Sequence, residues 1–474
     1  MPDPRRWQAL ALVCVAMFMT VLDVSIVNVA LPSIKTSLHV SDESLQWVVT
    51  AYAISFGGFL LLGGRAGDLL GRRRMFMSGI ALFSVASLVC GLAGSIGVLV
   101  AARAVQGVGA AIVSPATLSI ITTTFDEGAE RNKALGIWGA MGGSGAAAGV
   151  LFGGILTKYA GWEWIFFVNV PVGVAVLALT RTVVRESRIP GLHGFDFPGA
   201  AAITSALALL VYGISKAPDV GWGSGRTIGF LLAAAALLAT FVVVERRTAA
   251  PMMPFRIFRI HTVLGANVCG FLLGAVVFSN FFLLTLYVQQ VLGYSALKAG
   301  VTFLATAGTI IPVAGVSQAL VTRVGVRPVL CAGLALITAG MLFYSQIPVH
   351  GHYASDLLPG YLLVAFGMAF SFIPISIAAL AGVEHHEAGL ASGLINTAQQ
   401  IGGALGVAIA STITFTHMRT LLHTGHDPAT ALTSGFRLAF WVIAAFGAAG
   451  ALLAFVLVRG RELEHPEEAV VVPG

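Results

Sequence analysis

Long apolar runs dominate the pattern of hydrophobic and polar positions along this chain, and short polar stretches separate them. A helix of about 20 apolar residues crosses a hydrocarbon core of about 30 Å, and runs of this length recur from one end of the sequence to the other. They predict fourteen membrane-spanning helices, at 8–31, 45–64, 75–93, 98–123, 134–157, 163–182, 197–215, 227–245, 262–289, 296–321, 326–346, 357–382, 387–416 and 434–458.

The composition agrees with a membrane protein. Hydrophobic residues make up 57% of the chain and charged residues only 10%, with a mean hydropathy of +0.89, whereas soluble domains carry about 25% charged residues. The first run exceeds the apolar core of a signal peptide, so we interpret it as a retained span. The four cysteines lie inside apolar runs without paired spacing, which indicates packing rather than a disulfide framework or a zinc site.

The distribution of basic residues predicts the orientation. The net charge is +6, but the basic residues occupy short loops rather than one continuous patch, which argues against a nucleic-acid partner. Most Lys and Arg residues fall in loops on the same side of the membrane as the N-terminus. Because cytoplasmic loops carry the excess of basic residues, we expect both termini in the cytoplasm and the chain in the inner membrane.

A weak internal repeat suggests two related halves. The segment DLLGRRR (68–74) resembles TRVGVRP (322–328), and ERNKALG (130–136) resembles EAGLASG (387–393). Repeated halves around a central site are a transporter architecture. The expected domains are a six-helix bundle over 1–190, two inserted helices over 191–250, and a second six-helix bundle with a short tail over 251–474.

Only two charged side chains fall deep inside the predicted spans, Asp23 and Arg103. At a rise of about 1.5 Å per residue, Asp23 lies about 22 Å from the inner face and Arg103 about 8 Å from the outer face, so they share a depth. A charge inside a membrane normally faces a partner or a water-filled cavity. Burial favours the neutral carboxyl and a nearby guanidinium favours the ionised one, which suits a proton switch. The alternatives are a fixed structural ion pair, or an arginine that bonds only helix carbonyls.

These residues belong to segments that resemble the major facilitator superfamily, and within it the fourteen-helix drug:proton antiporter family. The similar segments span nearly the whole chain: LDVSIVNVALP (22–32), GRAGDLLGRRR (64–74), RAVQGVG (103–109), WEWIFFVNVPVG (162–173) and AGLASGLINTAQQIG (388–402). The resemblance implies an all-α, polytopic fold with two pseudo-symmetric six-helix halves and two inserted helices. It also implies roles in proton coupling for Asp23 and Arg103. Two positions depart from the family pattern: Val150 follows Gly149 where a proline is usual, and 303–305 lacks another common proline.

Two further motifs carry candidate residues. The resemblance implies a cytoplasmic gate at Gly64, Arg65, Gly67, Asp68, Gly71, Arg72 and Arg73. Its acid, glycines and arginines suit a breakable latch, and a solvated basic turn is the alternative. The antiporter-motif glycines are Gly145, Gly149, Gly153 and Gly154. The first three share one helix face and permit close backbone approach, which we interpret as packing between the moving halves.

Polar and aromatic residues at mid-depth are candidates for lining a substrate cavity, although each can instead serve packing or an interhelical hydrogen bond. These candidates are Asn28, Tyr52, Gln106, Trp138, Met141, Asn280, Gln289, Asn396, Gln399 and Gln400. A mostly apolar pocket with sparse polar groups suits amphipathic ligands.

The sequence therefore predicts a proton-coupled antiporter that exports amphipathic drugs or antibiotics by alternating access. We expect it to act as a monomer, without cofactor or metal. No P-loop or nucleophile-elbow motif supports ATP-driven transport or a hydrolase. The alternatives are an exporter or symporter of one endogenous metabolite and, from another class, a membrane scaffold or membrane enzyme.

Overall fold

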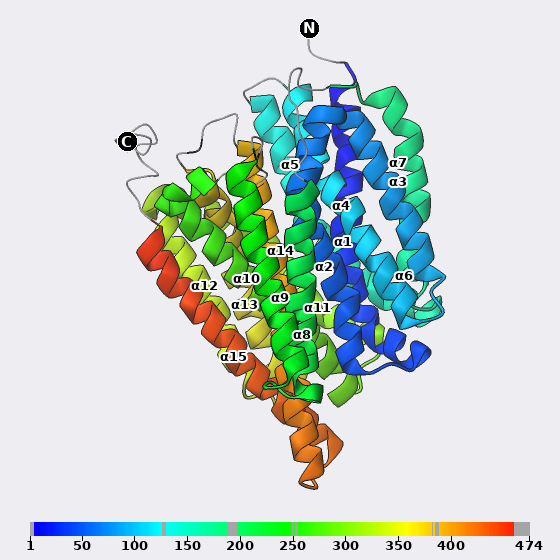
Figure 1. Cartoon of the computed structure of the whole chain (residues 1–474), viewed down its shortest axis with the longest axis vertical. Helices are drawn as coiled ribbons and strands as arrows, with labels where there is room; N and C mark the ends of the chain where they lie inside the picture. The colour runs from blue at the N-terminus through cyan, green and yellow to red at the C-terminus, as the bar shows by residue number, and fades with distance from the viewer. Residues whose placement is uncertain are drawn as a thin grey trace. The chain divides into compact units, whose positions relative to one another are not determined.

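The computed structural model describes residues 4–125, 129–187, 197–248, 251, 255–381, 383 and 388–458 (Figure 1), and all regular secondary structure in these ranges is helical. The first eight helices in chain order are α1 (Arg6–Leu38), α2 (Asp42–Leu70), α3 (Arg72–Gly91), α4 (Ile96–Thr124), α5 (Ala129–Tyr159), α6 (Trp164–Phe167), α7 (Asn169–Val183) and α8 (Phe197–Val220). Those that follow are α9 (Gly225–Arg247), η1 (Phe255–Arg259), α10 (His261–Leu286), η2 (Tyr287–Val291), α11 (Ala296–Val324), α12 (Val326–Tyr344), η3 (Tyr353–Leu357), α13 (Leu358–Ala379), α14 (Ala388–His423) and α15 (Pro428–Leu457).

Each predicted span coincides with a helix or a pair of consecutive helices. Within the described ranges, eleven helices are long and apolar enough to cross a membrane, and α6 and α7 together form one of them. The remaining three predicted spans lie on α2, α5 and α8, of which α8 has a shorter apolar stretch at Ala201–Ala217. Large apolar side chains such as Leu92, Trp441 and Phe455 are exposed, as expected where the surrounding solvent is lipid.

Contacts between residues divide the chain into two compact units. Unit 1 comprises Met1–Ala206, Ala236–Met252 and Ser295–Val301, and unit 2 comprises Leu207–Ala235, Met253–Tyr294 and Thr302–Gly474.

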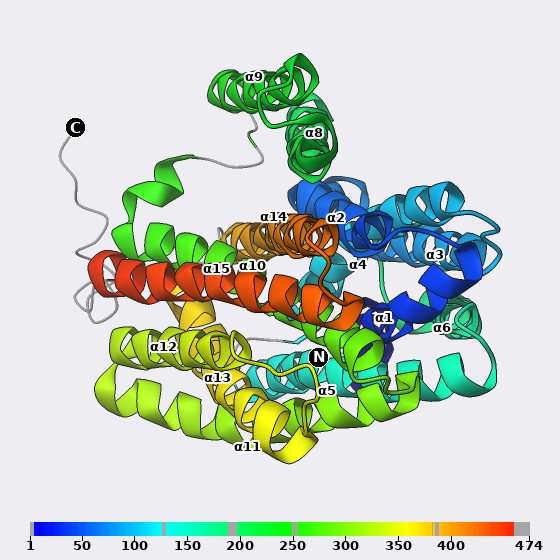
Figure 2. The ribbon, with the colours of Figure 1, turned by 90° about the horizontal axis from the view of Figure 1, so that it is seen from below.

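In unit 1, α1 packs along α5, and α4 packs between α2 and α3; Figure 2 shows α2, α3 and α4 seen nearly along their axes. The core contains fully buried Phe76, Ile80 and Phe83 on α3 against Ala110 and Val113 on α4. Close approach of these helices depends on small residues: a Cβ added at Gly107 would lie 2.5 Å from the Tyr52 carbonyl oxygen. This approach of α4 to α2 brings polar side chains of α4 within reach of the α2 backbone.

In unit 2, α10 packs against α14 and α15, and α12 packs against α13 and α15. Aromatic rings fill its core: Tyr344 lies 5.3 Å from Phe440 and 6.1 Å from Tyr361 between ring centroids. Gly402 and Gly406 of α14 face the carbonyl oxygens of Phe271 and Ala275 on α10. The glycine-lined pair α10 and α14 therefore matches the pair α1 and α5 in unit 1, consistent with the sequence repeat.

Candidate proton-coupling site

An ion pair lies inside unit 1, between the middle of α1 and the first half of α4. Arg103 Nη1 lies 2.5 Å from Asp23 Oδ2. The Asp23 side chain has no exposed surface and the Arg103 side chain only 2%. The two deep charges that the sequence placed at one depth are thus direct partners.

Two neutral amide side chains complete the bonding of the Asp23 carboxylate, and a buried serine bonds both amides. Gln106 Nε2 and Asn169 Nδ2 donate to Asp23 Oδ1 at 2.8 and 3.0 Å. Both amides also donate to the Ser87 hydroxyl, at 3.2 and 3.0 Å, and Ser87 donates onward to the Phe166 carbonyl oxygen at 2.9 Å. Gln106, Asn169 and Ser87 are all buried. Helices α4 and α7 therefore bond the carboxylate of α1 directly, and α3 bonds the two amides that do so.

Arg103 is fixed by further contacts around its guanidinium. Its Nε donates to the Val48 carbonyl oxygen of α2 at 3.0 Å, and its Nη1 also donates to Gln106 Oε1 at 2.7 Å. The Tyr52 ring lies 4.3 Å from the guanidinium carbon and the Phe166 ring 5.8 Å, within the range of a cation–π interaction. The Tyr52 hydroxyl has no hydrogen-bond partner among the described residues.

This arrangement places two opposite charges in direct contact away from the protein surface. Charge-assisted hydrogen bonds are stronger than neutral ones, and removing one partner from a buried pair leaves an uncompensated charge that costs about 3–5 kcal/mol. Protonation of Asp23 would cancel its attraction for Arg103 and turn an acceptor into a donor. With both side chains sealed from the surface, a proton can reach Asp23 only when the helices around it move. The site can therefore couple protonation to conformation.

Sequence reasoning missed two members of this cluster, Ser87 and Asn169. Asn169 stands in the segment 162–173 that carries the family resemblance, and Ser87 is a polar residue in the middle of an apolar run. Their polarity inside predicted spans was the available signal, but their meeting near Asp23 depends on the packing of α7 against both α1 and α3. Gln106 and Tyr52, predicted as cavity candidates, both contact this ion pair, and their role in lining a cavity stays a prediction.

The predicted gate motif spans the end of α2 and the start of α3. Gly71 has a φ of 106° and precedes the first residue of α3. Glu186, which the sequence analysis did not select, accepts from the backbone amides of Arg73 and Arg74 at 3.1 and 3.2 Å. Gly71 has no side chain that could accept from the first amides of α3, and the Glu186 carboxylate takes this capping role.

The other gate residues divide between buried and accessible positions. Gly67 is buried, whereas Gly64, Arg65, Arg72 and Arg73 are half-buried. The Asp68 side chain lies outside the described part of the chain, so its latch role stays a prediction.

The antiporter-motif glycines of α5 face two different helices. Cβ atoms added at Gly145, Gly149 and Gly153 would lie 3.1, 2.7 and 2.9 Å from carbonyl oxygens of α1. The expectation that these three pack between moving halves is therefore not what the structure shows, because α1 and α5 belong to the same bundle. A Cβ atom added at Gly154 would instead lie 2.8 Å from the Cα atom of Leu297, at the start of α11. The helix runs unbroken through Val150 from Ala129 to Tyr159.

The remaining cavity candidates are dispersed in both units. In unit 1, Trp138 Nε1 donates to the Thr117 hydroxyl at 3.0 Å, and Asn28 Nδ2 donates to the Val24 carbonyl oxygen of its own helix at 2.9 Å. Met141 packs against the core. In unit 2, Asn280 is buried, Asn396 is exposed, and Gln289, Gln399 and Gln400 are half-buried. Their role in substrate binding stays a prediction.

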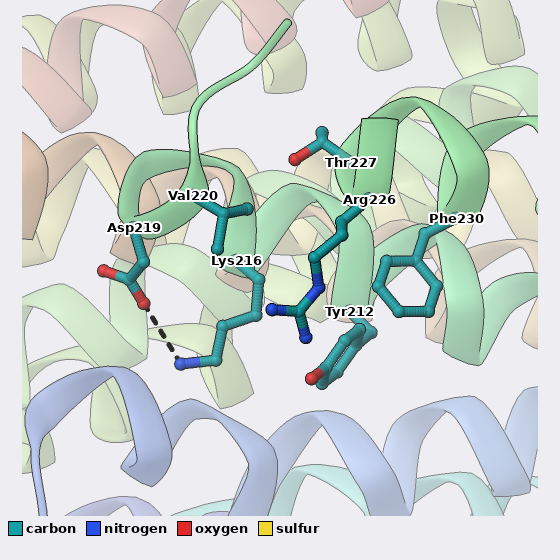
Figure 3. A pocket seen from close by; sticks show the side chains of 7 residues that line it. All are labelled: Tyr212, Lys216, Asp219, Val220, Arg226, Thr227 and Phe230. Atoms are coloured by element: carbon teal, nitrogen blue, oxygen red, sulfur yellow. Dashed lines mark hydrogen bonds and ion pairs between the residues drawn. The ribbon is translucent and has the colours of Figure 1, made fainter. Parts of the chain in front are cut away.

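A separate cavity of about 230 Å³ lies in unit 2 between the end of α8 and the start of α9 (Figure 3). Asp219 Oδ2 accepts a hydrogen bond from Lys216 Nζ at 3.1 Å, and Asp219 Oδ1 accepts one from Arg419 Nη1 of α14 at 2.6 Å. The Arg419 hydrogen bond is the main reason that the pKa of Asp219 is lowered from its usual value. The cavity is lined by Tyr212, Lys216, Asp219, Val220, Arg226, Thr227 and Phe230. Within the described residues, no group of three or more His, Cys, Asp and Glu side chains could hold a metal ion.

Long apolar helices around a buried, hydrogen-bonded ion pair indicate a polytopic membrane protein. The sequence profile of the Major Facilitator Superfamily matches residues 13–407, and the chain belongs to that family. It is therefore a transporter and not an enzyme.

Curated relatives agree with this assignment. The chain is 39% identical over 469 residues to the puromycin resistance protein pur8 of Streptomyces alboniger, covering 97% of this chain and 93% of that protein. It is 40% identical over 410 residues to the cephamycin export protein CmcT of Amycolatopsis lactamdurans, covering 86% and 84%. Among solved structures, the POT family transporter PepTSo aligns with a TM-score of 0.69 at 14% identity, over 98% of this chain and 99% of that one, which shows a shared fold.

Proposed function

We propose that this protein is a proton-coupled antiporter that exports amphipathic drugs, antibiotics or related small molecules from the cytoplasm. Two kinds of observation support the proposal. Relatives that match most of the chain are named for puromycin resistance, cephamycin export and lincomycin resistance. The observation that carries proton coupling is the sealed pair of Asp23 and Arg103 with its ring of amide and hydroxyl donors.

In the proposed cycle, the pair controls which side of the membrane the protein opens to. With Asp23 ionised, the salt bridge and the donors from α4 and α7 hold α1 in place. Proton uptake releases Arg103 from the carboxylate, and its remaining contacts are the Val48 carbonyl oxygen, the Gln106 amide and the aromatic rings. The helices are then free to rearrange, and alternating access follows from repeated protonation and release.

The single deep acid suggests a low proton stoichiometry. If one proton exchanges for one monovalent cation, no net charge crosses the membrane, and the pH gradient alone supplies about 1.4 kcal/mol per unit. Exchange for a neutral drug moves one charge, which adds about 2.3 kcal/mol per 100 mV.

The proposal includes a topology and an assembly. All fourteen predicted spans cross the membrane, both termini lie in the cytoplasm, and the protein acts as a monomer without a cofactor. Two six-helix bundles, at 1–190 and 251–474, flank an inserted pair at 191–250.

The deciding experiment measures collapse of the pH gradient in inverted vesicles when cationic, neutral and anionic drugs are added. We expect Asp23→Asn to abolish drug-dependent proton movement. The matched control is Asp427→Asn, because Asp427 caps α15 by accepting from the Thr430 amide and asparagine caps a helix equally well. Drug-dependent proton movement that survives in Asp23→Asn would refute the coupling role. Proton movement in the same direction as the drug would indicate a symporter.

A further inference from the structure

The Arg103 guanidinium on α4 has partners on two other helices. Its Nη1 donates to the Asp23 carboxylate of α1, whereas its Nε donates to the Val48 carbonyl oxygen of α2 at 3.0 Å. The Tyr52 ring, also on α2, lies 4.3 Å from the guanidinium carbon. The α2 helix packs closely along α4, but α1 packs mainly along α5. The ion pair therefore joins two pairs of helices, while the contacts with α2 stay within one pair.

Packing between α2 and α4 keeps Tyr52 beside Arg103. A Cβ atom added at Gly107, about one turn after Arg103 on α4, would lie 2.5 Å from the Tyr52 carbonyl oxygen. Tyr52 is 2% exposed, and its ring lies 5.8 Å from the Phe56 ring between centroids. If α1 moves away from α4, the carboxylate leaves the guanidinium, but the Tyr52 ring and the Val48 carbonyl oxygen remain beside it.

The ring, rather than the hydroxyl, is the part of Tyr52 that contacts Arg103. The face of an aromatic ring attracts a cation without carrying a net charge, so this attraction does not require an ionised carboxylate nearby. The Phe166 ring, at 5.8 Å from the guanidinium carbon, lies near the limit of about 6 Å for such a contact. The Tyr52 hydroxyl has no hydrogen-bond partner among the described residues, so its removal breaks no hydrogen bond with them.

We propose that the Tyr52 ring is a positioning group that keeps Arg103 in the site while Asp23 is neutral. This inference rests on the protonation step of the proposed function. After proton uptake the buried guanidinium has lost its counter-charge, and the ring offsets part of that loss until the proton leaves and the ion pair forms again. The Cys90 thiol, which can also titrate, donates to Gln106 Oε1 at 3.7 Å, the same oxygen that accepts from Arg103 Nη1.

The test compares Tyr52→Phe with Tyr52→Leu in the native protein and in Asp23→Asn, which supplies a neutral side chain of nearly the same size as the carboxylate. The difference between phenylalanine and leucine at this position measures the contribution of the ring. The thermal unfolding midpoint of the purified full-length protein in detergent is recorded for each combination. We expect the midpoint to fall from phenylalanine to leucine in both proteins, and about twice as far or more in the Asp23→Asn protein.

The control is Phe83→Leu, which removes a fully buried ring from the apolar core of unit 1 and should lower the midpoint equally in both proteins. Drug-dependent proton movement in inverted vesicles gives a second measurement. We expect Tyr52→Leu to lower its maximal rate about tenfold or more without changing the drug concentration that gives half of that rate. Tyr52→Phe should recover most of the lost rate, because it keeps the ring.

Equal effects of the ring in both proteins would overturn the inference, because Tyr52 would then only fill space. Equal loss of rate in Tyr52→Phe and Tyr52→Leu would overturn it as well, by assigning the role to the hydroxyl. If Tyr52→Leu or Asp23→Asn does not fold, pentafluorophenylalanine at position 52 gives the decision, because it keeps the shape of phenylalanine and reverses the charge distribution of the ring. A maximal rate equal to that of Tyr52→Phe would then contradict the contact. Failure of the proposed function is distinguishable, since it would appear as proton movement that survives in Asp23→Asn, whereas the unfolding comparison requires no transport.

Discussion

At the scale of single residues, the Asp23 carboxylate shows how much a buried charge depends on neutral neighbours. Arg103 supplies the opposite charge, but Gln106 and Asn169 supply the donors to Oδ1, and Ser87 orients both amides. A hydrogen bond to a charged group contributes about 1.5–3 kcal/mol. The two amides and the arginine therefore hold the buried carboxylate together.

Asn169→Ala tests this role. The substitution removes one of the two amide donors to Asp23 Oδ1, and a buried acceptor left without its donor costs about 1–3 kcal/mol. We expect a lower thermal unfolding midpoint in detergent and slower drug-dependent proton movement.

The control for Asn169→Ala is Asn267→Ala, because the Asn267 amide is also buried but donates to the Val263 carbonyl oxygen of its own helix. An unchanged unfolding midpoint together with unchanged proton movement in Asn169→Ala would show that Asn169 does not act on Asp23.

The pKa of Asp219 gives a second prediction at this scale. Its pKa is lowered mainly by the hydrogen bond from Arg419, so the native state favours the ionised carboxylate. The resulting stability is present above the unfolded pKa of about 3.9 and is lost as the pH falls through the lower native pKa.

Because the side chains of Asp219 and Arg419 are 32% and 41% exposed, screening limits their interaction to about 0.2–1 kcal/mol. A double-mutant cycle with Asp219→Asn and Arg419→Gln, measured by thermal unfolding in detergent, should give coupling near pH 7 that weakens as the pH falls through the lowered native pKa of Asp219. No measurable coupling near pH 7 would contradict the ion pair.

At the scale of helices, glycine determines which helices touch. On α5 the stripe of Gly145, Gly149 and Gly153 meets backbone carbonyls of α1, and α14 repeats this contact against α10. The α1 carbonyl oxygen facing Gly149 belongs to Leu22, the residue before Asp23. Packing of α5 therefore fixes the position of the Asp23 carboxylate.

Gly149→Ala should separate α1 from α5, because the new Cβ would lie 2.7 Å from both the Leu22 carbonyl oxygen and the Ser25 side chain. Overpacking of this kind costs about 1–3 kcal/mol. We expect a lower thermal unfolding midpoint and slower drug export.

Gly229→Ala is the control for Gly149→Ala, because Gly229 lies inside α9 and a Cβ added there would meet no atom of the described residues within 4 Å. Alanine there should leave stability equal or higher, since it is the better helix former. Equal effects of the two substitutions would show that the contact with α1 is not under steric constraint.

At the scale of the whole molecule, the helix lengths and the alternation of spans and loops define the proposed topology. The α14 helix has 36 residues, a length of about 54 Å that exceeds a hydrocarbon core of about 30 Å. In Figure 1 the adjoining ends of α14 and α15 form a helical hairpin at the bottom of the view. If all fourteen spans cross, this hairpin and the turn between α8 and α9 lie outside the cell.

Single cysteines introduced in a cysteine-free background test that topology. Gly223→Cys and Thr424→Cys should react with a membrane-impermeant maleimide in intact cells. Thr322→Cys lies at the C-terminal end of α11, on the cytoplasmic side in the proposed topology, and should react only after the membrane is opened. All three positions are exposed. Labelling of Thr322→Cys in intact cells, or of Gly223→Cys only in opened cells, would rule out the proposed arrangement.

The sequence by itself determined the class of fold, the position of each predicted span and the depth shared by Asp23 and Arg103. These properties depend on local hydrophobicity and on the fixed rise of a helix, which are readable one segment at a time. Only the tertiary structure decided that Ser87 and Asn169 complete the carboxylate site, that Glu186 caps α3, and that the glycines of α5 pack on α1. Those contacts join residues far apart in the chain, and they depend on which helix faces turn toward one another, which hydropathy alone does not specify.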